Sequence, residues 1–173
     1  PAQRVERRAA ASPLQRRIGK YTVIETIGEG AMGIVYKALD PDIQRTVALK
    51  TIQRRDAAAS ISGVANALRF RNEAQAAGRL HHPGIVSVFD YGEEGDESYI
   101  AMEYVQGPTL AECARRERLP LADVLSIACQ LLEALQCAHS QNVWHRDIKP
   151  GNLILTEAGQ LKVADFGIAR IDA

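Results

Sequence analysis

The sequence feature that most constrains the fold is a glycine-rich segment between two runs of strand-forming residues. Gly28, Gly30 and Gly33 form the pattern GxGxxGxV, which dinucleotide-binding folds also use. In those folds a helix follows the last glycine, whereas residues 34–41 are strand-like and end too soon for a helix. The glycines therefore predict a hairpin in which backbone N–H groups can approach phosphate oxygens without obstruction by a Cβ atom.

Strand-forming residues recur on both sides of this hairpin. Short β-branched runs predict antiparallel strands at residues 21–28, 33–39, 45–52, 85–89 and 98–105. Residues 63–80 are rich in alanine and run into Pro83 and Gly84, which predicts one helix between the third and fourth strands. The first half of the chain is therefore expected to form an α+β lobe with a five-stranded antiparallel sheet and one main helix.

The composition becomes helical after Gly107 and Pro108. Apolar side chains then recur at the spacing of a buried helix face, at Leu121, Val124, Leu125, Ala128, Leu131, Leu132 and Leu135. Short apolar fragments at residues 153–155 and 161–164 predict a small strand pair around a polar loop. A second lobe is expected to begin here.

Composition and charge argue against several classes of protein. The 173 residues contain 21 Lys and Arg and 21 Asp and Glu, so no overall basic field favours nucleic acid. Charges interrupt the apolar stretches before they reach the length of a membrane span, so no such span is predicted. Cys113, Cys129 and Cys137 make neither a disulfide framework nor a CxxC metal pair, which fits a reducing cytoplasm.

Two charged residues lie where they could act on the predicted hairpin. Lys50 lies near the end of a strand beside the glycines, where its ammonium could neutralise phosphate charge. Glu73 on the predicted helix is a candidate counter-ion that would hold Lys50 extended. Taken singly, a lysine near a strand end is usually solvated and a glutamate on a helix is usually a surface residue.

A more specific signal follows the long helix. Residues 145–152 read His-Arg-Asp-Ile-Lys-Pro-Gly-Asn, and Asp165-Phe166-Gly167 comes after the predicted strand pair. Together with the glycine hairpin and Lys50, these blocks resemble the signature set of protein kinases, from Tyr21 to about Arg170. Lys149, two residues after Asp147, resembles the lysine found there in the serine/threonine branch. The residues within the motifs are similar to those of bacterial eukaryotic-like (Hanks-type) kinases.

The resemblance implies a protein-kinase-like α+β fold in three parts. Residues 1–20 would be a flexible arm rich in arginine and alanine, since they contain almost no large apolar residues. Residues 21–105 would be the N-lobe with the ATP-binding loop, and residues 106–173 the first part of the helical C-lobe.

The resemblance also implies a role for each polar residue of the motifs. Lys50 would contact the α- and β-phosphates of ATP and Glu73 would orient Lys50. Asp147 would accept the proton of a substrate hydroxyl, and Lys149 would steady the γ-phosphate. Asp165 and Asn152 would bind Mg²⁺, with Mn²⁺ as the alternative ion.

A larger set of residues would surround the nucleotide. Ile27, Val35, Ala48 and Ile154 would sandwich adenine, Met102 would be the gatekeeper, and backbone groups of Glu103 and Val105 would bond the adenine edge. The loop over the phosphates would comprise Gly28, Glu29, Gly30, Ala31, Met32, Gly33 and Ile34.

Three functions remain open at this point. The first is a protein kinase that transfers the γ-phosphate of ATP to Ser or Thr hydroxyls of protein substrates. The second is a nucleotide-binding module that acts by interaction, and the third is a small-molecule phosphotransferase. The chain ends at Ala173, before the segments that bind a peptide substrate in kinases, so we expect these residues alone to be inactive. We also expect the helix after Pro120 to keep apolar surface that later helices would cover, and the oligomeric state stays open.

Overall fold

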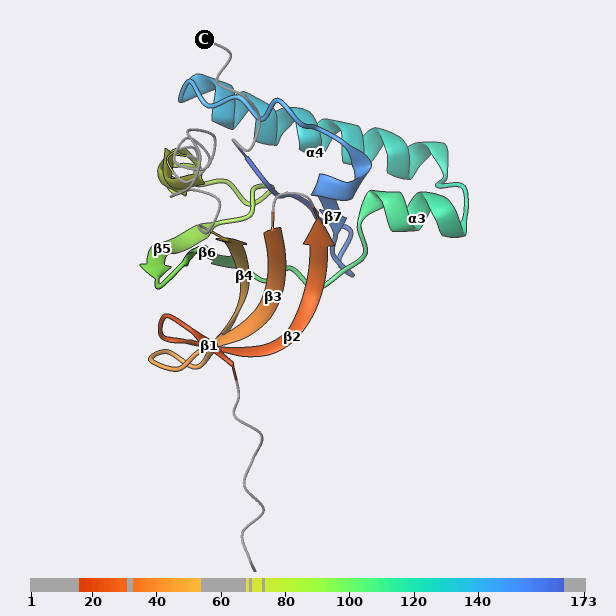
Figure 1. Ribbon diagram of the computed structural model, residues 1–173. Helices are drawn as coiled ribbons and strands as arrows, with labels where there is room; N and C mark the ends of the chain where they lie inside the picture. Colours follow the sequence, from red (N-terminus) through yellow and green to blue (C-terminus); the bar gives the residue numbers. More distant parts are fainter. Residues whose placement is uncertain (1–15, 31–32, 54–67, 69, 73, 167–173) are drawn as a thin grey trace, which may run out of the picture.

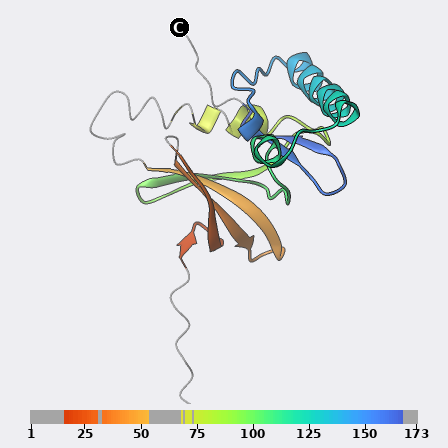
Figure 2. The same ribbon diagram turned by 90° about the vertical axis from the view of Figure 1, so that its right-hand side faces the viewer.

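The computed structural model describes residues 16–30, 33–53, 68, 70–72 and 74–166, and it places a curved sheet beside a helical layer (Figure 1). Turned by 90°, the sheet lies at one end of the molecule and the helices with a second, smaller sheet at the other (Figure 2). The two predicted lobes are therefore present, and the chain passes between them after residue 103.

Six antiparallel strands form the large sheet. They are β1 (Arg17–Ile18), β2 (Tyr21–Gly30), β3 (Gly33–Asp40), β4 (Arg45–Gln53), β5 (Val88–Glu94) and β6 (Glu97–Glu103). The strand order is β1-β2-β3-β4-β6-β5. The five predicted strands are present, and β1 is an addition that the sequence pattern did not indicate.

The prediction of a flexible arm is wrong for residues 16–20. Ile18 is 2% exposed and packs in a cluster with Tyr21 and Tyr36 on one face of the sheet. Arg16 donates to the Tyr36 hydroxyl at 2.7 Å and forms an ion pair with Glu97 at 2.8 Å. One buried isoleucine and one ion pair thus attach a stretch of otherwise polar composition; residues 1–15 lie outside the described part of the chain.

The helix predicted at residues 63–80 is described only in part, as helical backbone at residues 68, 70–72 and 74–77. The strand predicted from Ile85 begins at Val88 instead. The cause is a competing contact, because Val86 N donates to Val163 O at 2.9 Å and Val163 N donates to Gly84 O at 2.8 Å. The segment before β5 is therefore bonded to the second lobe.

The second lobe contains two helices and a strand pair. Its elements are α3 (Leu110–Arg116), α4 (Leu121–Ser140), the 3₁₀ helix η1 (Pro150–Asn152), β7 (Leu153–Leu155) and β8 (Leu161–Val163). Thr109 begins α3 with a capping box, in which its hydroxyl accepts from Glu112 N and the Glu112 carboxylate accepts from Thr109 N. The side chain of Gln130 on α4 accepts from Leu161 N at 2.8 Å and donates to Gly159 O at 3.2 Å, which fixes the β7–β8 hairpin against α4.

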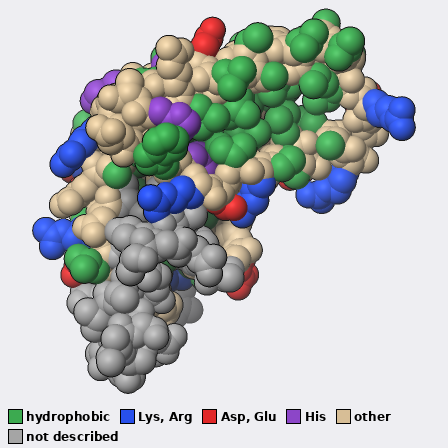
Figure 3. All heavy atoms as spheres, turned by 90° about the horizontal axis from the view of Figure 1, so that it is seen from above, with side chains coloured by type: hydrophobic (Ala, Val, Ile, Leu, Met, Phe, Trp, Pro, Cys, Tyr) green, Lys and Arg blue, Asp and Glu red, His purple; other side chains and the backbone are tan. Residues whose placement is uncertain are grey.

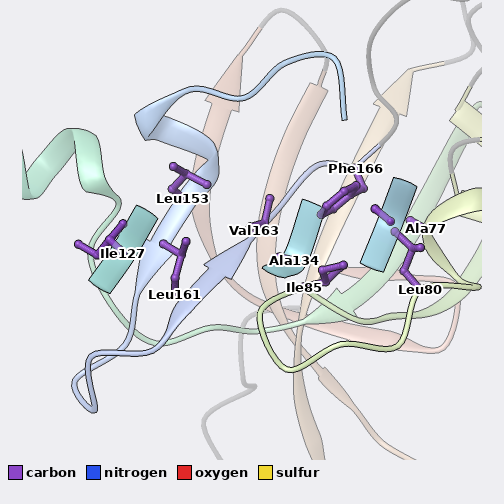
Figure 4. Close-up of a cluster of buried hydrophobic side chains, with 10 residues drawn as sticks. Ala77, Leu80, Ile85, Ile127, Ala134, Leu153, Leu161, Val163 and Phe166 are labelled. Carbon is purple, nitrogen blue, oxygen red and sulfur yellow. The ribbon is translucent and has the colours of Figure 1, made fainter. Parts of the chain in front are cut away.

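One apolar cluster joins elements from both halves of the chain (Figure 4). Ala77 and Leu80 come from the first lobe, and Ala134, Val163 and Phe166 from α4, β8 and the residues after β8. Because this shared core ends at Phe166, the position of the neighbouring Asp165 is set by packing.

Only part of the apolar face predicted for α4 is covered: Leu131 and Leu135 pack against the shared cluster. Ile127, Ala134 and Ala138 are buried, whereas several of the leucines and valines predicted to be buried are exposed: Leu121 (74%), Leu132 (66%), Leu125 (58%) and Val124 (45%). Figure 3 shows hydrophobic side chains gathered over this helix. The exposure agrees with the expectation that the helix keeps uncovered apolar surface. α4 also has the length and apolar composition of a membrane-spanning helix, a property that it shares with core helices of water-soluble proteins.

We expect this surface to make the 173-residue chain self-associate. Contiguous exposed apolar side chains favour association because association removes them from water. Leu125→Lys combined with Leu132→Lys should reduce the mass measured by light scattering towards that of a monomer. Ile43→Lys, at another exposed apolar residue, is the control and should change the mass little. A wild-type chain that stays monomeric at high concentration would contradict the expectation.

Candidate active site

The central contact of the site is an ion pair between the two lobes. Lys50 lies on β4 and is 5% exposed, and its Nζ contacts Asp165 Oδ1 at 2.9 Å. A buried ammonium requires an anionic partner, because burying the charge without one costs roughly several kcal/mol. Asp165 follows β8 with a φ of 59°, a left-handed conformation that non-glycine residues seldom adopt. Glu73, the predicted partner of Lys50, lies outside the described residues.

The predicted nucleotide-facing residues of the sheet share one face. Val35 pairs with Lys50 across β3 and β4, and Ala48 pairs with Met102 across β4 and β6. Paired residues, and residues two apart on one strand, point to the same side of a sheet. Ile34 is different, because its side chain packs against the buried cluster on the opposite face, so the structure does not bring it to this site.

The other predicted contacts border this face. Ile27 lies at a register shift of β2 and is 44% exposed, and Ile154 is on β7 in the second lobe. Glu103 ends β6, and Val105 is in the connection that follows it. The glycines of the hairpin enclose its turn, since Gly30 pairs with Gly33. Glu29 is exposed on β2, while Ala31 and Met32 lie outside the described residues.

The polar loop after α4 brings its three predicted residues together. Asp147 Oδ2 accepts from Lys149 Nζ at 2.7 Å and from Asn152 Nδ2 at 3.1 Å. The Lys149 ammonium, and then the Asn152 amide, lower the pKa of the Asp147 carboxyl, which is therefore charged at neutral pH. Ala164 N donates to Asn152 O at 2.9 Å, so the loop is bonded to the residue before Asp165.

His145 connects this loop to the end of β8. Its Nε2 donates to Ala164 O at 2.8 Å, its Nδ1 accepts from Asp147 N at 3.3 Å, and its ring packs edge-on against Phe166 at 4.7 Å. Both contacts fit the neutral ring, in which one nitrogen donates and the other accepts. Burial lowers the pKa of His145, which is 2% exposed.

This burial predicts a pH dependence of stability. The pKa of His145 in the folded state lies below its unfolded value of about 6.5. The contribution of the neutral ring to the free energy of unfolding is therefore complete above about pH 6.5 and is lost as the pH falls through the folded-state pKa. The free energy of unfolding, measured in denaturant, should therefore decrease as the pH is lowered from 7 to 5. His145→Gln should flatten that profile, whereas His81→Gln, at an exposed histidine, should leave it unchanged. Equal slopes in both variants would contradict the assignment.

Sequence reasoning missed a pocket behind the Lys50–Asp165 pair. Apolar side chains line the rest of it: Ala74, Ala77, Val86, Val88, Ile100, Met102 and Phe166. Of these, only Met102 was predicted, as the gatekeeper. Phe166 belongs to the Asp165-Phe166-Gly167 motif but was not assigned to a pocket. The remaining residues read as ordinary core residues in the sequence, and the pattern carries no signal that they enclose space.

The described residues contain no cluster of three or more His, Cys, Asp or Glu side chains that could hold a metal ion. The candidate ligands are instead one carboxylate, Asp165, and one amide, Asn152, which is 7% exposed. This small oxygen set fits Mg²⁺, which retains water and binds through one or two protein groups together with substrate phosphates. The donor set therefore fits an ion that arrives with a phosphorylated ligand.

The sequence is similar to those of known proteins. The family described as "Protein kinase domain" matches residues 21–172. The serine/threonine-protein kinase PrkC of Bacillus subtilis is 44% identical over 156 residues, covering 90% of this chain and 24% of PrkC. The serine/threonine-protein kinase PknA of Mycobacterium tuberculosis is 41% identical over 162 residues, covering 90% of this chain and 37% of PknA.

Solved structures agree. The crystal structure of the Mycobacterium tuberculosis PknI kinase domain superposes with a TM-score of 0.76 at 35% identity, covering 92% of this chain and 64% of that chain. The chain thus spans about a quarter to two fifths of the length of the two relatives above.

Proposed function

The chain belongs to the protein kinase domain family, and from this we propose that it forms the ATP-binding and phosphate-transferring part of a serine/threonine protein kinase. The observation that carries the proposal is the contact between Lys50 and Asp165, which lie 115 residues apart in sequence and meet at 2.9 Å beside the glycine hairpin. A cation and a carboxylate at this point are what a phosphate chain and its metal ion require.

In the proposed mechanism the first lobe binds the nucleotide. Adenine lies against the face that carries Val35, Ala48 and Met102, with Ile154 on the other side. The hairpin glycines cover the phosphates, and Lys50 exchanges its contact with Asp165 for the α- and β-phosphates. Burial of Lys50 strengthens this attraction because little water screens it.

The second lobe positions the acceptor. Asp147 orients a Ser or Thr hydroxyl and accepts its proton, and Lys149 moves from Asp147 to the γ-phosphate. Asp165 and Asn152 would hold Mg²⁺, or Mn²⁺ in its place, and the ion would supply neutralisation of the charge that develops on the transferred group. Asn152 keeps Asp147 in place through its bonds to the Asp147 carbonyl oxygen at 2.9 Å and to the carboxylate.

The proposed substrates are proteins, and the proposed location is the cytoplasm. The location is supported by a composition without a disulfide framework and by three cysteines, all free in the structure. The Ser/Thr preference is supported by Lys149 at its position after Asp147 and by the names of the relatives.

Calorimetric titration with ATP tests the proposal. ATP should bind more tightly in the presence of Mg²⁺, and Lys50→Met should weaken binding because the phosphates lose a buried cation. Lys20→Met removes a more exposed lysine that is paired with Asp40 and Asp42, and it should bind like wild type. Equal affinity with and without Mg²⁺, or an unaffected Lys50→Met, would overturn the proposed site.

A further inference from the structure

A second ion pair joins the lobes at the connection between them. Lys162 Nζ on β8 contacts Glu103 Oε1 at the end of β6 at 2.6 Å, with side-chain exposures of 13% and 27%. The ion pair Lys20–Asp42, at the far end of the sheet, is more exposed, at 40% and 66%. A largely buried pair is costly to separate, because each charge would be left without a partner in a poorly hydrated place.

Glu103 is also bonded to the segment that leads into β5. Glu103 N donates to Ser87 O at 2.8 Å, and Ser87 N donates to Glu103 Oε2 at 3.2 Å. The neighbouring Val86 is bonded to Val163 on β8. Ser87 thus bonds both the backbone and the carboxylate of Glu103, and Lys162 pairs with the same carboxylate.

The position of Lys162 on β8 points to the adenine side of the cleft. Lys162 pairs with Ile154 across β8 and β7, so the two side chains lie on the same face of the hairpin. Ile154 is expected to contact adenine, and backbone groups of Glu103 are expected to bond its edge. Lys162 therefore contacts Glu103 and lies beside Ile154, both of which belong to the proposed adenine subsite. Lys50 and Asp165 lie at the phosphate end.

We propose that Lys162 is a positioning residue for adenine recognition: its ion pair with Glu103 holds the backbone after β6 in the conformation that bonds the adenine edge. The inference rests on the proposed ATP site. A connection fixed before the ligand arrives loses less conformational freedom on binding, which favours affinity. Without the pair, the bonds to Ser87 remain but the Glu103 side chain is held only by Ser87, so more of the order must be supplied when the nucleotide binds.

The test separates the adenine subsite from the phosphate subsite with two probes. Adenosine carries the base without phosphates, and tripolyphosphate with Mg²⁺ carries phosphates without the base. Lys162→Met should weaken adenosine binding at least tenfold, roughly 1.4 kcal/mol, and leave tripolyphosphate binding unchanged. Lys162→Arg, which keeps the charge, should restore adenosine binding, and Lys20→Met should bind both probes like wild type.

A second variant guards against a folding defect. Glu103→Gln keeps an acceptor for Ser87 N and removes the charge that pairs with Lys162, and it should show the same loss that is selective for adenosine. Equal losses for both probes in the two variants would indicate general destabilisation and overturn the inference. Unchanged adenosine binding would overturn it as well. Failure of the wild-type protein to bind tripolyphosphate and ATP would instead overturn the proposed function and, with it, this inference.

Discussion

Replacing Asp147 with asparagine is expected to lower the rate of phosphate transfer to a protein hydroxyl by about 10² to 10⁴, the range of general acid–base catalysis. An amide cannot take the proton of the acceptor, although it keeps nearly the same shape and can still bond to Asn152. Lys149 would lose its carboxylate partner at 2.7 Å. The nucleotide contacts of Lys50 and Asp165 do not involve Asp147, so ATP affinity should stay close to that of wild type.

The measurement is a comparison of kcat with nucleotide affinity in the full-length protein that contains this chain. Asp42→Asn, at an exposed carboxylate in the turn between β3 and β4, is the matched control and should leave both values unchanged. If Asp147→Asn lowered ATP affinity as strongly as the rate, Asp147 would be a structural residue of the loop. Undiminished transfer would remove its assignment as the base.

Much of the fold follows from local patterns that the structure confirms. The β2–β3 hairpin could be predicted because Gly28, Gly30 and Gly33 are followed by a strand-like run and not by a helix. The strand predicted at residues 45–52, which carries Lys50, is β4, and the helical composition after Pro108 is followed by α3. Such signals depend only on neighbouring residues, so a sequence pattern can carry them.

The features that were missed depend on contacts between distant residues. Strand β1 exists because Ile18 packs on Tyr36 and Arg16 reaches Glu97. The start of β5 is delayed by the bonds of Val86 to Val163. The helical spacing of α4 predicts which residues share a face, but which face is covered depends on the elements that pack against it. Lys162 has no motif, and only its place opposite Glu103 distinguishes it from a surface lysine.

The glycines of the hairpin should respond to alanine in opposite ways. At Gly33 the φ is 121°, and a Cβ atom would lie 1.9 Å from the carbonyl oxygen of Thr51 in β4. At Gly30 such a Cβ atom would meet nothing within 4 Å among the described residues beyond its chain neighbours, so the position has room. Gly33→Ala should therefore lower the free energy of unfolding by at least about 3 kcal/mol, since the strained backbone and the clash add. Gly30→Ala should change it by less than about 1 kcal/mol.

Gly30→Ala, the variant expected to keep its stability, is the one expected to lose ATP affinity. Gly30 is proposed to let the backbone approach phosphate oxygens, and a methyl group there would hold them apart; Gly30→Ala should therefore weaken ATP binding in a protein that remains folded. Chemical denaturation followed by calorimetry on the folded fraction measures both effects. A Gly30→Ala protein with unchanged affinity would mean that the hairpin does not touch the phosphates. A stable Gly33→Ala protein would mean that β3 and β4 can move apart at Thr51, and the close approach would then not be a requirement of the fold.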